Sequence, residues 1–100
     1  MSTTPDDNKG AMLVLNVLEA LTGFAATGAK NGDLAQLVGT SAPNITRVLA
    51  VIAAKGWARK AENGRFYPTA AFTRLGFRVL ADFERLETRT ADTKRAMTGQ

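Results

Sequence analysis

One stretch of this chain, residues 31–56, limits its fold more than any other part of the sequence. Small residues stand at Ala35 and Gly39, and Ile45 follows in an otherwise apolar setting. Two short helices can cross closely when a small residue lies beneath the second helix and a glycine takes the positive φ of the turn between them. The spacing therefore predicts a helix-turn-helix, whose second helix commonly enters the DNA major groove.

Helical periodicity accounts for most of the remaining chain, because apolar residues recur every three or four positions in two further places. The two ends are polar, so we predict a disordered tail over residues 1–9 and a polar tail over 91–100. Asn31 is the predicted N-cap of the second helix, since its side chain can accept from first-turn amides. The predicted helices span about 10–22, 31–38, 41–55 and 70–90, with a glycine- and alanine-rich loop after the first.

Between the third and fourth predicted helices, two short aromatic segments flank the dipeptide Asn63-Gly64. Asn-Gly is a strong hairpin signal, because a type I′ turn needs positive φ at both of its central residues. We therefore predict a two-stranded β-hairpin of about 57–61 and 65–68. We expect its aromatic side chains to cover the helices instead of stacking on bases; they are Trp57, Phe66 and Tyr67.

Three helices, a hairpin and a further helix follow one another in the order of a winged helix-turn-helix, a mainly α fold. Residues 10–76 resemble the DNA-binding domain of the isocitrate lyase regulator (IclR) family of bacterial transcription factors. The resemblance lies in DLAQLVGTSAPNITRVLAVIAAKGW, in the hairpin and in FYPTAAFTRLG, which is similar to that family's wing and linker helix. It implies a DNA-binding domain over 10–69. The family's effector domain has no counterpart here, so we expect no small-molecule effector.

Charge is distributed unevenly along the 100 residues, which carry 13 basic and 9 acidic side chains and a net charge of +4. Between Asp33 and Asp82 the only acidic residue is Glu62. Such an excess of positive charge is typical of a surface that binds a polyanion, although a solvated basic face has the same composition. The basic residues of this segment are Arg47, Lys55, Arg59, Lys60, Arg65, Arg74 and Arg78.

The predicted third helix presents Arg47 as its one long side chain pointing squarely away from the core. Arginine can bind guanine O6 and N7 together, and asparagine can do the same with adenine. A phosphate contact, or an ordinary solvated residue, are the alternatives for Arg47. Thr40 and Ser41, at the helix entrance, suit either a phosphate or a plain helix cap.

The predicted hairpin is basic and could follow the DNA backbone or enter the minor groove. The alternative is that its charges protect edge strands from aggregation, and both roles are compatible. Together with the third helix it completes the candidate DNA-binding set, which is Thr40, Ser41, Asn44, Thr46, Arg47, Arg59, Lys60, Asn63 and Arg65.

The predicted fourth helix carries apolar residues in the 4-3-4-3 spacing of a coiled-coil seam. We expect a homodimer joined through this seam, and the alternative is a helix that only caps the monomer core. A two-fold dimer would place two recognition helices about 34 Å apart, or a multiple of that, and would favour a palindromic site. The predicted dimerisation residues are Phe72, Val79, Phe83 and Leu86.

The chain contains no cysteine and no histidine. Disulfides, thiolate metal sites and histidine-based acid–base chemistry are therefore excluded, and we expect no enzyme activity, no cofactor and no metal site. No apolar run reaches membrane-spanning length and the N-terminus is unlike a signal peptide, so we expect a cytoplasmic protein.

The predicted function is that of a sequence-specific double-stranded DNA-binding protein, acting as a small transcriptional regulator of a bacterium, phage or mobile element. Two alternatives stay open at this point. One is a winged-helix module that binds protein and never DNA. The other is an architectural accessory factor in transposition or excision.

Overall fold

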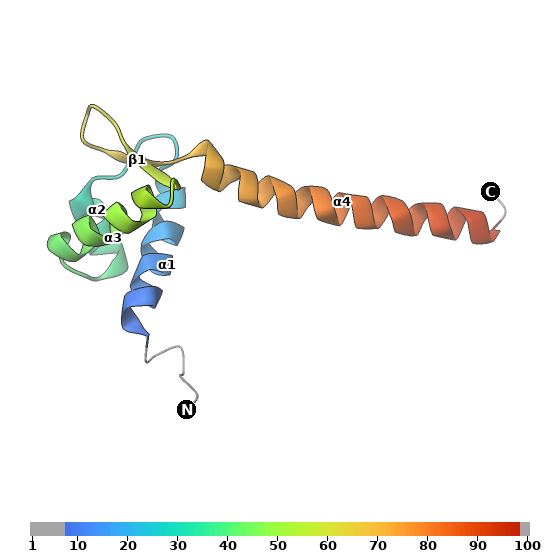
Figure 1. The fold of residues 1–100 in the computed structure, drawn as a ribbon, viewed down its shortest axis with the longest axis horizontal. Helices are drawn as coiled ribbons and strands as arrows, with labels where there is room; N and C mark the ends of the chain where they lie inside the picture. Colours follow the sequence, from blue (N-terminus) through green and yellow to red (C-terminus); the bar gives the residue numbers. More distant parts are fainter. Residues whose placement is uncertain (1–7, 99–100) are drawn as a thin grey trace.

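The computed structural model of the chain describes residues 8–98, which form four α-helices, one 3₁₀ turn and one two-stranded antiparallel hairpin (Figure 1). The predicted N-terminal tail lies outside the described residues except for Asn8 and Lys9, and Lys9 already begins the first helix. The elements are α1 (Lys9–Leu21), the 3₁₀ turn η2 (Thr22–Phe24), α2 (Asn31–Val38), α3 (Ala42–Ala54), β1 (Ala58–Lys60), β2 (Phe66–Pro68) and α4 (Ala70–Thr98).

The first three helices share one apolar core. Leu21 of α1, Leu34 of α2 and Leu49 of α3 are all fully buried in it. Each of these helices places its apolar residues three or four positions apart, so that they face the same side. Burial of one such side chain stabilises the fold by about 1.5–3 kcal/mol. The core therefore fixes how α1, α2 and α3 are placed relative to one another.

The predicted close crossing of α2 and α3 is present, and the two helices are bent 105° from each other. Ala35 is buried beneath α3, and Gly39 ends α2 with φ +83. Ser41 caps α3, because its hydroxyl oxygen accepts a hydrogen bond from the Asn44 amide at 3.3 Å. This arrangement is compatible with a helix-turn-helix followed by a wing.

The N-cap of α2 differs from the predicted one. Lys30 occupies that position, and its amide donates to the Asp33 carboxylate at 3.4 Å. Asn31 is the first helical residue instead, and its side chain points to α3, where it donates to Thr46. The predicted cap was wrong because a tertiary hydrogen bond takes the asparagine side chain away from its own helix.

The hairpin pairs Ala58 with Pro68 and Lys60 with Phe66, close to the predicted register. Its turn is not the predicted type I′. Gly64 donates to the Ala61 carbonyl and Ala61 donates to the Arg65 carbonyl, both at 2.9 Å, while positive φ in this turn is confined to Gly64. These bonds define a type I turn followed by a glycine bulge, in which Asn63 keeps a negative φ.

The segment between α1 and α2 is more ordered than the predicted loop. It begins with η2, and Phe24 of that turn packs against the core. Ala29 is fully buried and forms a β-bridge with Phe66, exchanging two backbone hydrogen bonds of 2.8 and 2.9 Å. The segment therefore lies beside β2 as a short third strand-like piece and supports the hairpin from one side.

The helix α4 projects away from the other elements as a single long rod (Figure 1). Its 29 residues extend through Thr98, so the predicted polar tail is helical over 91–98. The residues there are mostly polar but include no proline or glycine, and an Asp92–Arg95 ion pair of 3.9 Å lies on this part of the helix.

No single helix in the described part of the chain is both long and apolar enough to cross a membrane. Only α2 and α3 taken together meet that test, and they are bent by 105° and bury their apolar residues in the core.

Candidate nucleic-acid interface

A chain of three side chains organises the N-terminal half of α3. The Asn44 side-chain amide donates to the Thr40 hydroxyl at 2.9 Å, and the Arg47 guanidinium donates to the Asn44 carbonyl oxygen. Asn44 and Thr40 are half-buried, whereas Arg47 is exposed. Asn44 therefore holds the Arg47 side chain in place. The guanidinium of Arg47, at the end of this series of three side chains, faces solvent.

Thr46 is committed to the fold. Its hydroxyl donates to the Ala42 carbonyl at 3.1 Å and accepts from the Asn31 side chain at 2.7 Å. Both hydrogen bonds are intramolecular, and the second ties α3 to the start of α2. Thr46, a DNA-binding candidate, thus links the two helices. Ser41, another candidate, likewise uses its hydroxyl group within the fold, as the cap of α3.

The hairpin presents two exposed cations on opposite faces. Arg59 lies over the Tyr67 ring, 4.8 Å from its centroid, and Lys60 lies 5.9 Å from the centroid of Phe66. A cation above an aromatic face is attracted by the ring's quadrupole and loses little of its hydration when the site is open. The rings thus restrain both side chains while their charges stay accessible to a phosphate.

The other two hairpin candidates, Asn63 and Arg65, hold the hairpin in place. The Asn63 carbonyl oxygen accepts from the Arg65 amide at 2.9 Å, which closes the turn. The Arg65 guanidinium donates to the Gly28 carbonyl at 3.3 Å, so its charge is tethered to the loop before α2. These contacts position the hairpin. Arg59 and Lys60 therefore remain as the exposed cations of the hairpin.

Tyr67, which was expected to cover the helices, completes this attachment of the hairpin to the loop before α2. Its hydroxyl donates to the Thr27 carbonyl at 3.4 Å, and its ring lies against Gly28. A Cβ at Gly28 would stand only 2.6 Å from the Tyr67 ring carbon Cζ. Glycine at a positive φ is a signal of close backbone approach, yet its partner forty residues away cannot be read from local pattern.

The start of α3 and the tip of the hairpin lie at the same end of the molecule, away from the free end of α4 (Figure 1). Carboxylates are scarce there, because the described chain between Asp33 and Asp82 contains Glu62 alone. The exposed positive charges at this end are Arg47, Arg59 and Lys60. Arg59 and Lys60 point to opposite sides of the hairpin, so the three cations form a group around this end and not one flat surface. We call this group the basic face.

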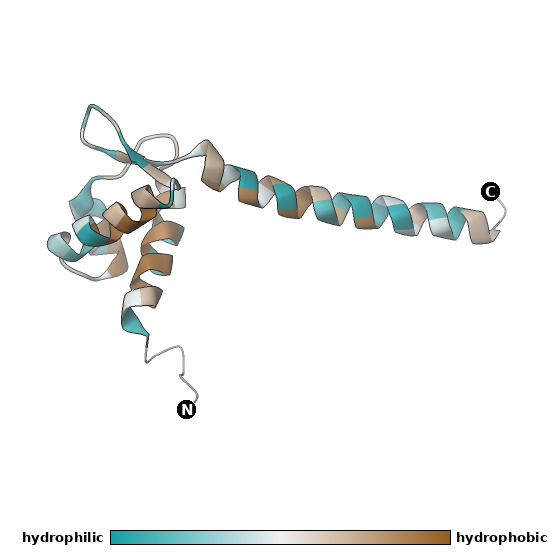
Figure 2. Cartoon of the chain, viewed as in Figure 1, coloured by the Kyte–Doolittle hydropathy of each residue, from teal (hydrophilic) through white to brown (hydrophobic). Residues whose placement is uncertain are grey.

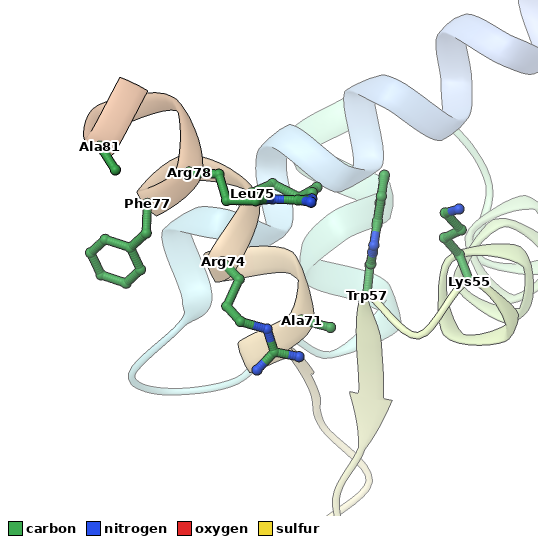
Figure 3. Close-up of a pocket in the computed structure, with 8 residues that line it drawn as sticks. All are labelled: Lys55, Trp57, Ala71, Arg74, Leu75, Phe77, Arg78 and Ala81. Carbon is green, nitrogen blue, oxygen red and sulfur yellow. The ribbon is translucent and has the colours of Figure 1, made fainter. Parts of the chain in front are cut away.

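A second basic region was not singled out from the sequence. An open cleft of about 630 Å³ separates the Trp57 region from the first turns of α4 (Figure 3). Lys55 and Trp57 line one side, with the ammonium 5.3 Å from the indole centroid, and Arg74 and Arg78 come from the other. The i, i+4 spacing of Arg74 and Arg78 was the sequence signal that could have placed both arginines on one face of the helix.

Among the described residues, no three histidine, cysteine, aspartate or glutamate side chains gather where they could hold a metal ion. Comparisons with protein-family models, with curated proteins and with solved structures found no match.

Proposed function

We propose that this protein is a winged helix-turn-helix regulator of transcription that binds double-stranded DNA through the basic face. The observation that carries the proposal is the exposed Arg47 guanidinium, held by Asn44 on the outer side of a helix that crosses α2 at 105°. The resemblance of residues 10–76 to the IclR DNA-binding domain points the same way.

The two parts of the basic face suit different parts of DNA. A helix of 13 residues such as α3 fits the major groove, and a fixed arginine fork matches guanine O6 and N7. The hairpin cations are point charges on a narrow projection and suit phosphates or the minor groove. Because Asn44 and Thr46 are engaged within the protein, base reading falls mainly on Arg47, and much of the affinity is electrostatic.

A protein-interaction module is the second candidate, and one observation favours it. The outer sides of α2 and α3 also expose apolar residues, Leu37 at 64% and Val51 at 56%. Large apolar side chains that are exposed on a small domain are typical of surfaces that contact another protein. The basic face argues against this reading, because a partner protein would need a matching acidic surface.

Salt dependence distinguishes the two candidates. We expect binding to random duplex DNA at about 50 mM salt, with log affinity falling by about 0.9 per log unit of salt for every phosphate neutralised. Fluorescence anisotropy of a labelled duplex at several salt concentrations gives the slope. A folded sample without detectable binding at about 50 mM salt would overturn the proposal and favour the protein-binding alternative.

A matched control separates the basic face from net charge. Arg85 is an exposed arginine on α4, paired only with its neighbour Asp82 at 3.0 Å. Arg85→Ala removes the same charge as Arg47→Ala but lies outside the proposed interface. We expect Lys60→Ala to weaken binding to random duplex and to reduce the salt slope by about one phosphate, and Arg47→Ala to weaken binding mainly to a preferred site. Arg85→Ala should leave these quantities nearly unchanged.

A further inference from the structure

The first half of α4 exposes an apolar face that no other part of the described chain covers. Val79, Phe83 and Leu86 are 57%, 61% and 54% exposed, and Leu80 beside them is 52% exposed. Figure 2 shows apolar residues gathered along the half of α4 nearer the hairpin, with mostly hydrophilic residues beyond it. A contiguous apolar face of this kind marks a binding surface.

One predicted seam residue is already occupied within the monomer. Phe72 packs against the core, and its ring lies 5.6 Å from that of Trp57 at a tilt of 49°. Phe72 therefore belongs to the junction between α4 and the rest of the fold. Thr69 also lies at this junction, because its hydroxyl donates to the Gly56 carbonyl. The free part of the seam begins at Gly76 and continues through Leu86.

We infer that this face binds the same face of a second copy of the chain, and that the two α4 helices run antiparallel. A second copy is the favoured occupant because the heptad spacing of α4 is self-complementary and because the charges beside the seam select one direction. In a coiled coil, the residues that flank the seam on either side pair across the interface and decide which orientation forms.

A parallel, in-register pair would bring like charges together. Phe83 and Leu86 are one pair of core residues in the seam. Asp82 directly precedes this pair and Glu87 directly follows it. Arg89 and Lys94 occupy the same two positions one heptad later. In parallel helices, the residue at the position before the core lies beside the residue of the partner subunit that is five positions further along, at the position after the core. Asp82 would then face Glu87 of the partner subunit and Arg89 would face Lys94 of the partner subunit, on both sides of the dimer.

An antiparallel pair removes these repulsions. When Phe83 packs against Leu86 of the partner subunit, Asp82 lies beside Arg89 of the partner subunit, and symmetry repeats both contacts. Asp82 pairs within its own helix with Arg85, but this bond is exposed and weak, so a second cation can share the carboxylate. Asp82 and Arg89 are thus complementary in this orientation, whereas Glu87 and Lys94 face the uncharged Leu80 and Thr73 of the partner subunit. In the parallel orientation all four flanking charges face like charges.

The direction of α4 decides where the two basic faces lie. The two-fold axis of the antiparallel pair passes between residues 84 and 85, so at 1.5 Å per residue the two Ala70 positions stand about 44 Å apart. The folded regions before α4 then lie at opposite ends of the rod. A dimer of this kind reaches two DNA half-sites separated by more than one helical turn.

Cysteine cross-linking tests the orientation directly, because the native chain has no cysteine. We would prepare Val79→Cys and Thr90→Cys separately, oxidise each alone and oxidise a one-to-one mixture. The antiparallel pair places position 79 beside position 90 of the partner subunit, so we expect a disulfide-linked heterodimer from the mixture and none from either variant alone. A disulfide-linked dimer of Val79→Cys alone or Thr90→Cys alone would show parallel helices and overturn the inference.

A charge exchange gives an independent readout. Asp82→Arg should weaken the dimer by about fivefold in sedimentation, because each Arg89 would then face an arginine, and the double exchange Asp82→Arg with Arg89→Asp should restore it. Parallel helices predict that Asp82→Arg strengthens the dimer, since the new arginine would face Glu87. A wild-type chain that stays monomeric at high micromolar concentration also overturns the inference, and leaves the DNA-binding proposal to be judged separately.

Discussion

Arg47 donates a hydrogen bond to Asn44, one turn earlier on α3, and Asn44 donates in turn to Thr40. The three side chains form a short relay on the surface of the helix. Its effect is to restrict the rotamers of a long arginine that would otherwise move freely in solvent. Ordering a side chain before binding reduces the entropy that binding must remove.

Removing the middle member should therefore weaken binding without unfolding the protein. We expect Asn44→Ala to reduce duplex affinity by about two- to tenfold, since about 0.5–1.5 kcal/mol is lost when a mobile side chain is immobilised on binding. Stability should fall by about 0.5–1.5 kcal/mol, because the half-buried Asn44 loses its hydrogen bond to Thr40. A double-mutant cycle with Arg47→Ala is the measurement, and purely additive losses would show that Asn44 does not act through Arg47.

Sequence discrimination should depend on α3 and not on the hairpin. Arg47→Ala is expected to cost about 1–3 kcal/mol on the preferred site and much less on random DNA. Lys60→Ala should weaken both to a similar degree, because a phosphate contact carries no sequence information. Binding of each variant to a selected site and to a scrambled duplex measures the difference. An unchanged affinity ratio in Arg47→Ala would assign Arg47 to a phosphate.

Gly28 should tolerate no side chain. Gly28→Ala combines φ +78 with a Cβ 2.6 Å from Tyr67, so we expect a loss of about 2–4 kcal/mol of unfolding free energy. Gly64→Ala is a matched control, because Gly64 has φ +81 but no atom within 4 Å of the added Cβ, and it should lose only about 1 kcal/mol. Denaturant unfolding of both variants gives the comparison. Equal losses would mean that the contact with Tyr67 is unimportant.

Thr69 should control how firmly α4 is attached. Its hydroxyl donates to the Gly56 carbonyl at 2.6 Å and accepts from the Phe72 amide at 3.3 Å. Thr69→Val keeps the shape but removes both bonds, and we expect a loss of about 1–2 kcal/mol in stability. Thr69→Ser keeps the hydroxyl and should retain most of it. Faster amide exchange in the first turn of α4 in the valine variant would report the loosened junction.

Local signals in the sequence were sufficient for the main elements. The boundaries of α2 were predicted correctly, and Gly39 and Ser41 act as the turn glycine and the helix cap. These features depend on residues within four positions of one another, so a pattern of residue types contains them. The apolar face of α3 was predicted for the same reason, since Ile45, Val48, Leu49 and Ile52 are its buried residues.

Tertiary contacts decided the features that local pattern could not. Asn31 left its expected cap position because Thr46 lies across the helix crossing. The turn at Asn63 is a different case, because its side chain closes onto Arg65 and Tyr67, which are only two and four residues further along the chain. Asparagine side chains bind whichever polar group lies within about 3 Å, and that group is set by packing between distant segments.

The division between sequence and structure follows from the range of each interaction. The sequence alone determined where α2 and α3 lie within a residue or two, which face of α3 is apolar, and where positive charge accumulates, because periodicity and charge are local properties. Only the tertiary structure decided that Asn31 binds Thr46, that Arg65 binds the Gly28 carbonyl, and that Gly28 lies beneath Tyr67. These contacts exist only once the core has brought α1, α2, α3 and the hairpin together.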